Sequence, residues 1–376
     1  MTKTRPLRPF AASRPVRGAL SVALAATISA CATADARDVT ARPAVAEQVG
    51  ATTPAAERRL ALLQLADLLE QMYVLPSEGE RYAAFLRDRA ERLDDVAPDP
   101  AVFAQRITDE LRSIHEDRHL RLEVRQQGGG PGGPGDAGPS MDMPPSSLLS
   151  SEQLGHGIHY LRFDSLWGDE ATMRQLDDLL RPNHVPSALI IDLRHNRGGG
   201  LREIDFLFSH LLTETTDLLV MEIRRQVFEM DGGPFAEGPN LMRIDSPETS
   251  VRLMHRAMPA AEPKLADTAL ILLTSPTTGS AAEHLALAVK KMGRGLLVGE
   301  TTRGAGNFGG IIPISQTFQA FVPAGRTYDP ANGIGWEGTG VSPDIAVGSG
   351  SALGVALERL GVPEDERDAL AAKVEP

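Results

Sequence analysis

The sequence predicts an α/β protein, in which apolar strands alternate with amphipathic helices. Between residues 158 and 322, short apolar runs of strand length alternate with longer segments whose apolar residues recur at helical spacing. The chain has 376 residues, 42% of them hydrophobic, and can therefore bury a sizeable core. We find no internal repeat that would indicate a solenoid.

The composition excludes several other classes of protein. The formal net charge is -12 and the body of the chain has no cluster of Lys and Arg, so nucleic acid is not an expected partner. A single cysteine, Cys31, can form neither an internal disulfide nor a cysteine-rich zinc site. No cofactor and no metal ion is expected, and packing must stabilise the fold.

The first 30 residues are typical of an export signal, with five basic residues, no acidic residue and a short apolar run over 18–30. The run ends in Ile28-Ser29-Ala30-Cys31, which resembles the lipobox of bacterial lipoproteins. This resemblance implies an acyl anchor on Cys31 at the periplasmic side of a bacterial membrane, with the outer membrane preferred. An ordinary signal peptide is the alternative. Cleavage would change the net charge from -12 to -17.

The remaining chain is expected to divide into five parts. Residues 31–56 are rich in Ala and Thr and predict a flexible tether. Residues 57–125 predict a helical subdomain with one helix near 60–72, another from Asp99-Pro100 and a strand at 120–124. A Gly/Pro-rich loop at 126–147, an α/β core at 148–346 and a helical tail at 347–376 complete the chain.

Within the core, the same patterns predict the individual elements. Strands are expected at 158–163, 188–193, 218–223, 268–274, 296–298 and 311–322, helices at 169–180, 201–212 and 281–292, and an irregular excursion at 226–264.

The strongest candidate for a nucleophile is Ser280, which lies between the strand ending at Thr274 and the helix beginning at Ala281. A serine at such a turn projects its hydroxyl from the carboxyl edge of a sheet, beside the free N–H groups of a helix start. Taken alone, the segment favours a helix cap over a nucleophile.

Three further segments could supply partners to Ser280. Gly198, Gly199 and Gly200 follow an apolar strand and could present backbone N–H groups, although the turn is neither a dinucleotide nor a Walker motif. His119 could act as a general base, and a metal site with His115 is a weaker alternative, although the segment taken alone favours two surface histidines without a function. The Gly-rich segment 336–344 contributes one acid beside a tryptophan, Glu337.

Taken in order, these segments resemble the C-terminal processing (tail-specific) serine peptidase superfamily. The matching pieces are 117–120, 190–199, 273–283, 298–302 and 336–344. The resemblance implies a crotonase/ClpP-like core with a small helical amino-terminal domain, a peptide or protein substrate and Ser280 as the nucleophile. It also implies an oxyanion hole formed by the N–H groups of Ala281 and of Gly198 or Gly199.

The branch of tricorn core peptidases and interphotoreceptor retinoid-binding protein repeats is the more similar one. Where many bacterial members carry a catalytic lysine, in a pattern like Phe-Gly-Lys-Gly, this chain has Ala305. The resemblance therefore implies His119 as the base and Glu337 as its orienting acid. Glu283 and Asp117 are expected beside the site, where they would support the reacting groups.

A PDZ domain is not expected, since only 33 residues separate Val124 from Ile158. Two other functions stay open at this point. The scaffold could bind an apolar ligand or a peptide without catalysis, or it could hydrolyse esters by the same acyl-enzyme chemistry. The sequence does not define the oligomeric state.

Overall fold

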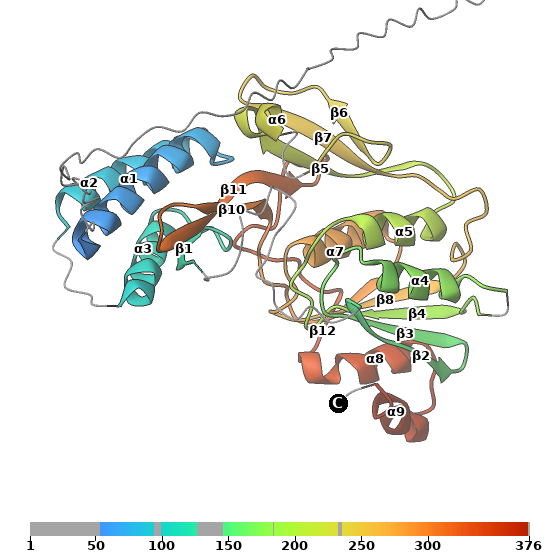
Figure 1. Ribbon diagram of the computed structural model, residues 1–376. Coiled ribbons are helices and arrows are strands. Elements are labelled where there is room, and N and C mark those ends of the chain that lie inside the picture. The colour runs from blue at the N-terminus through green and yellow to red at the C-terminus, as the bar shows by residue number, and fades with distance from the viewer. Residues whose placement is uncertain (1–52, 94–98, 126–145, 183, 232–234, 375–376) are drawn as a thin grey trace, which may run out of the picture. The chain divides into compact units, whose positions relative to one another are not determined.

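The computed structural model describes residues 53–93, 99–125, 146–182, 184–231 and 235–374 (Figure 1). The expected signal, the lipidation site Cys31, nearly all of the tether and most of the Gly/Pro-rich loop lie outside these residues. Within the described residues, no helix combines the length and the apolar character needed to cross a membrane.

Two six-stranded sheets organise the described chain. The strands of the first, here called the core sheet, lie in the order β12 (Ile345–Ala346), β9 (Leu296–Gly299), β8 (Ala269–Thr274), β4 (Ala188–Asp192), β3 (Ile158–Phe163) and β2 (Leu148–Gly155). Neighbouring strands from β3 to β12 are parallel, and β2 pairs antiparallel with β3. The α/β fold class is thus confirmed.

Helices cover both faces of the core sheet (Figure 1). One face packs on α4 (Glu170–Leu179), α5 (Arg202–Leu211) and α7 (Ala281–Met292), and the other on α8 (Ala352–Arg359) and α9 (Glu364–Ala371). All five residues of β4 are buried, because alternate side chains enter the two cores: Leu189 and Ile191 enter the first, and Ile190 the second.

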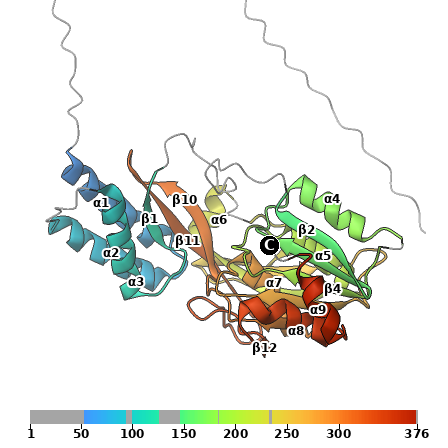
Figure 2. The same ribbon diagram turned by 90° about the horizontal axis from the view of Figure 1, so that it is seen from below.

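The second sheet is antiparallel and joins distant parts of the chain. Its path runs β1 (Arg121–Val124), β11 (Phe318–Tyr328), β5 (Thr216–Arg224), β7 (Ser250–Ala257) and β6 (Leu241–Ile244), and β10 (Asn307–Pro313) pairs with β11. Three helices pack near its β1 end (Figure 2): α1 (Pro54–Met72), α2 (Pro76–Glu91) and α3 (Pro100–Ile114). Their core includes Phe318, Ala320 and Val322 of β11, so the helical subdomain is completed by a late segment of the chain.

The structure differs from the expected elements in several places. The segment 226–264 is not irregular, since it contains α6 (Arg225–Asp231), β6 and β7. The single strand expected at 311–322 is the hairpin of β10 and β11, and neither α2 nor β2 was expected. Helix α1 begins inside the expected tether, because the Thr53 hydroxyl caps it by accepting the N–H of Ala56 at 3.3 Å, and Pro54 suits its first turn.

Candidate active site

Ser280 lies at the turn between β8 and α7, in a strained backbone conformation with φ 55° and ψ -121°. Only one other described residue besides glycine, His156, has a positive φ. Gly198 packs closely against Ser280: any other residue at position 198 would place its Cβ atom only 2.5 Å from the Cβ atom of Ser280. Strain of this kind persists only where the surroundings enforce it, and it is concentrated at functional sites.

Glu283 holds this turn in place from within α7. Its side chain is fully buried and accepts four hydrogen bonds. Oε1 accepts from the hydroxyl of Thr302 and the N–H of Gly304, both at 2.6 Å, and Oε2 accepts from the N–H of Ser280 at 2.9 Å and that of Ala305 at 2.8 Å. Burial raises the pKa of Glu283, and these hydrogen bonds oppose the shift.

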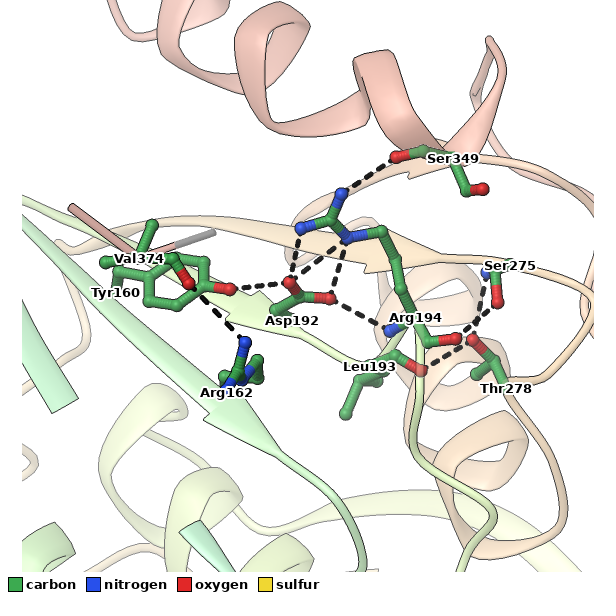
Figure 3. A network of polar contacts seen from close by, with 9 residues as sticks. All are labelled: Tyr160, Arg162, Asp192, Leu193, Arg194, Ser275, Thr278, Ser349 and Val374. Carbon is green, nitrogen blue, oxygen red and sulfur yellow. Dashed lines mark hydrogen bonds and ion pairs between the residues drawn. The ribbon is translucent and has the colours of Figure 1, made fainter. Parts of the chain in front are cut away.

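A buried polar network fixes the glycine turn after β4 (Figure 3). The carboxylate of Asp192 accepts from the guanidinium of Arg194, with the shortest contact at 2.6 Å, and from the hydroxyl of Tyr160 at 2.6 Å. The carbonyl of Arg194 accepts from Ser275, and that of Leu193 accepts from the hydroxyl of Thr278 at 2.7 Å. The network therefore ties the glycine turn to the turn that carries Ser280.

The backbone amides beside Ser280 differ in their availability. The N–H of Gly198 donates to Oδ1 of Asn196 at 2.8 Å, so it is already occupied. Among hydrogen bonds between described residues, none uses the N–H of Gly199 or of Ala281 as a donor. Of the two glycines expected in an oxyanion hole, Gly199 is thus the one with a free amide.

His119 lies between α3 and β1, in a segment that the helical subdomain holds in place. Asp117 is fully buried and accepts from the N–H of His119 at 2.8 Å, the hydroxyl of Tyr73 at 2.7 Å and the amide of Asn307 at 2.8 Å. The His119 ring stacks on Phe321 with 5.3 Å between ring centroids. Its Nδ1 is buried and has no hydrogen-bond partner among the described residues. Burial lowers the pKa of His119 to about 4, although Asp117 opposes the shift.

Glu337 lies close to His119 and Asp117: one ligand atom from each of the three residues lies within 4.8 Å of the other two. Oε1 of Glu337 accepts from the N–H of Arg118 at 2.6 Å, and Oε2 accepts from those of Gly306 and Asn307 at 2.6 and 2.7 Å. Burial, followed by repulsion from Asp117, raises the pKa of Glu337 to about 7.

Three such side chains could in principle bind a metal ion. However, each oxygen of Asp117 already accepts two hydrogen bonds, and the two oxygens of Glu337 accept three between them, so few lone pairs are left for a cation. This favours a cluster in which neighbouring backbone and side-chain donors hold the two carboxylates beside His119 over a metal site.

Four consecutive backbone amides, here called the amide strap, connect the two halves of the site. The strap runs from Gly304 to Asn307. Its first two N–H groups donate to Glu283 and its last two to Glu337. The strap therefore connects the Ser280 turn with the His119 cluster, and Ala305 lies within it. No hydrogen bond joins the Ser280 hydroxyl to the His119 ring, both of which lie in the described part of the chain.

Sequence reasoning missed the residues that hold this arrangement together. Tyr73 and Asn307 contact Asp117 from 44 and 190 positions away, so no local pattern could identify them. Asn196 holds the glycine turn through its bond from the N–H of Gly198, and the sequence analysis gave it no role. Its place two residues before a glycine is a usable signal, because asparagine side chains often bind the backbone two residues on.

The sequence profile of peptidase family S41 matches residues 157–347, about half of the chain. A chloroplastic C-terminal processing peptidase from Tetradesmus obliquus is 28% identical over 206 residues, which are 54% of this chain and only 36% of that protein.

Two solved structures share the fold. A lipoprotein from Streptococcus agalactiae has a TM-score of 0.53 at 16% identity, covering 83% of this chain and 98% of that one. A predicted peptidase from Parabacteroides merdae has a TM-score of 0.52 at 16% identity, covering 85% and 97%. Since the family profile spans half of the chain and includes the Ser280 turn and Glu337, the chain belongs to peptidase family S41.

Proposed function

We propose that this chain is a serine peptidase that hydrolyses peptide bonds through an acyl-enzyme on Ser280. The observation that carries the proposal is the strained Ser280 turn, which packs against Gly198. The N–H groups of Ala281 and Gly199 donate to no other described residue. A nucleophile at a tight strand-to-helix turn has an accessible hydroxyl and a helix start behind it. A mere helix cap would not require the positive φ that Ser280 adopts.

In this mechanism the Ser280 oxygen attacks the substrate carbonyl carbon while its proton passes to His119. The lowered pKa of His119 keeps the ring neutral near pH 7 and able to accept that proton. The amides of Gly199 and Ala281 would donate to the oxyanion. The C–N bond then breaks, the amine leaves with the proton from His119, and water hydrolyses the ester by the same route in reverse.

Glu337 would orient His119 and stabilise its charged form during this transfer. The separation of up to 4.8 Å leaves room for a bridging water or a small closing movement when substrate binds. Glu283 is less suited to this role, because its oxygens hold the Ser280 turn and the amide strap. We therefore assign Glu337 as the third member of the triad.

Labelling with a fluorophosphonate probe tests the proposal. Wild type should be labelled, Ser280→Ala should not, and His119→Ala should react about a thousandfold more slowly. Ser113→Ala, which removes an exposed hydroxyl on α3, is the matched control and should be labelled normally. Equal labelling of wild type and Ser280→Ala would contradict the proposal. A folded wild type that neither reacts with the probe nor cleaves peptides or esters would favour a noncatalytic binding protein.

We also propose that the chain is exported and lipid-anchored through Cys31 at the periplasmic side of a bacterial membrane. The proposal rests on the lipobox-like segment 28–31. Growth with radioactive palmitate should label wild type, and Cys31→Ala should remain unlabelled. An unlabelled wild type that is cleaved and released would indicate an ordinary signal peptide.

A further inference from the structure

Three polar side chains, here called the histidine link, form a chain of hydrogen bonds that reaches the nucleophile helix α7. The link consists of Asp205 of α5, His255 of β7 and His284 of α7. Oδ1 of Asp205 lies 2.8 Å from Nε2 of His255, and Nδ1 of His255 lies 2.7 Å from Nε2 of His284. Both histidines are buried. The link thus ties two helices that cover the core sheet to a strand of the second sheet, and the proposed mechanism does not use it.

The carboxylate at one end sets the direction of these hydrogen bonds. An ionised carboxylate can only accept, so Nε2 of His255 carries a hydrogen and donates it to Asp205. In the neutral ring, Nδ1 of His255 is then bare, and it accepts from the Nε2–H of His284. Burial, followed by repulsion from His255, lowers the pKa of His284, so its ring stays neutral near pH 7. Asp205 therefore fixes the hydrogen-bonding arrangement of both rings.

The last ring of the link contacts Trp336, which directly precedes Glu337. The imidazole of His284 and the indole meet edge to face, with 6.2 Å between centroids and 82° between planes, an attractive arrangement for two rings. Trp336 is 3% exposed, and its Nε1 has no hydrogen-bond partner among the described residues. Packing therefore orients the indole, and His284 is one of the groups that supply it.

The indole also contacts the amide strap. A Cβ atom on Gly306 would lie 3.4 Å from both Cδ1 and Cδ2 of Trp336 and 2.9 Å from the backbone nitrogen of Glu337. The N–H of Gly306 donates to Oε2 of Glu337 at 2.6 Å. Because the indole, the strap and the acid are in direct contact, a displaced indole would move Glu337 relative to His119.

We propose that Asp205, His255 and His284 are positioning residues, which hold Trp336, and through it Glu337, in place for catalysis. The inference rests on the proposed function, because it assigns a support to the third member of the triad. The three residues act through the indole and not on the substrate. Asp205 is the most accessible of them, since its side chain is 32% exposed, and it can be replaced without opening the core.

Fluorescence of the full-length protein tests the inference without catalysis. The chain has two tryptophans, so in Trp167→Phe only the buried Trp336 emits. Acrylamide should quench this emission weakly, and adding Asp205→Ala should raise the quenching constant, because a loosened indole becomes accessible. Asp205→Asn keeps an acceptor oxygen for His255 and should restore weak quenching. The matched control Asp178→Ala removes the acid of an exposed ion pair in α4 and should leave quenching weak.

The pH dependence of fluorophosphonate labelling tests whether the link supports catalysis. Burial raises the pKa of Glu337 to about 7, so a looser and better hydrated Glu337 should have a lower pKa. In Asp205→Ala, the pH at which the labelling rate falls on the acid side should therefore decrease by about one unit or more. It should stay at about 7 in Asp205→Asn and in Asp178→Ala. A variant that is merely less stable, but still folded, would not show this shift.

A second variant acts from the other end of the link. His284→Phe keeps a ring beside Trp336 but cannot donate to His255, and it should show the same shift as Asp205→Ala. Unchanged quenching in Asp205→Ala would overturn the inference, and so would an acid limb that stays at about 7 in that variant. Failure of the proposed function gives a different result. Wild type would then resist the probe at every pH, and quenching would still decide whether the link holds the indole.

Discussion

Replacing Glu283 by glutamine tests how the Ser280 turn is held in its strained conformation. The two oxygens of Glu283 accept from four donors, namely the hydroxyl of Thr302 and the backbone amides of Ser280, Gly304 and Ala305. Glutamine has almost the same shape, but one acceptor oxygen becomes an NH₂ donor. In either orientation that group faces a backbone N–H.

The cost follows from these contacts. At least one backbone N–H loses its acceptor, and the buried NH₂ must find a new one, at about 1–3 kcal/mol for each unsatisfied group. Burial raises the pKa of Glu283, which means that its charged form is disfavoured there, so the removal of that charge offsets part of this loss. We expect the free energy of unfolding to fall by about 2–4 kcal/mol. Acylation should also slow, because either orientation removes a hydrogen bond that holds the Ser280 turn or the amide strap in place.

Urea unfolding at pH 8, followed by circular dichroism, measures the change, and Glu203→Gln is the matched control. Glu203 is also fully buried, but Oε1 accepts only from the N–H of Gly168 at 2.6 Å, and Oε2 has no partner among the described residues. Its amide keeps that one bond, and the new NH₂ replaces an oxygen that had no partner either. One unsatisfied group thus replaces another, and the free energy of unfolding should change by less than about 1 kcal/mol. Equal decreases in the free energy of unfolding of Glu283→Gln and Glu203→Gln would refute the reasoning, because the decrease would then not depend on how many donors the carboxylate binds.

Three further predictions concern pH and the glycine turn. If ionised Glu337 is needed, kcat/KM of the wild type should rise as the pH increases through about 7. In Glu337→Gln, the pH at which the residual kcat/KM falls on the acid side should move toward about 4, the pKa of His119. A pH profile that does not move contradicts this. Asp192→Asn breaks the ion pair between the buried carboxylate of Asp192 and Arg194 and should cost about 3–5 kcal/mol in thermal or urea unfolding, whereas a loss below 1 kcal/mol would refute it. Burial lowers the pKa of His284, so the neutral ring stabilises the fold above about pH 6.5 and this contribution is lost as the pH falls. In His284→Gln, the free energy of unfolding should therefore fall less steeply between pH 8 and pH 5 than in the wild type. An unchanged slope of that free energy against pH contradicts this.

The parts of the fold with strong local signals could be predicted from the sequence. The bounds of α7 agree with the prediction, because an apolar helical period begins after Ser280 and ends at Gly293 in the left-handed conformation. The continuous apolar run of β4 likewise indicates a strand covered on both faces.

The elements that were missed have weak or misleading patterns. In β6, two of the four residues are exposed, so no alternation is visible in the sequence. The turn that separates β10 from β11 contains neither Gly nor Pro. Instead, the Ser315 hydroxyl accepts from the N–H groups of Thr317 and Phe318, both at 3.1 Å. Such side-chain turns give little signal in a sequence.

In the site, too, local sequence patterns predict some features, whereas others depend on residues that are distant in the sequence. The position of Ser280 follows from the strand and helix on either side of it. The choice between Glu283 and Glu337 does not, because it depends on which donors occupy their oxygens. Most of those donors come from residues 302–307, and no periodicity links that segment to either acid.

The amide strap also bears on how the two halves of the site act together. Gly304 and Ala305 donate to Glu283, and the next two residues donate to Glu337, so neither carboxylate can move without pulling on the same four-residue segment. A change at one acid should therefore reach the other through the backbone, although the acids belong to α7 and to a distant loop. Residues that share partners in this way do not contribute additively. The nucleophile turn and the histidine cluster are thus better regarded as one mechanical unit than as two adjacent sites.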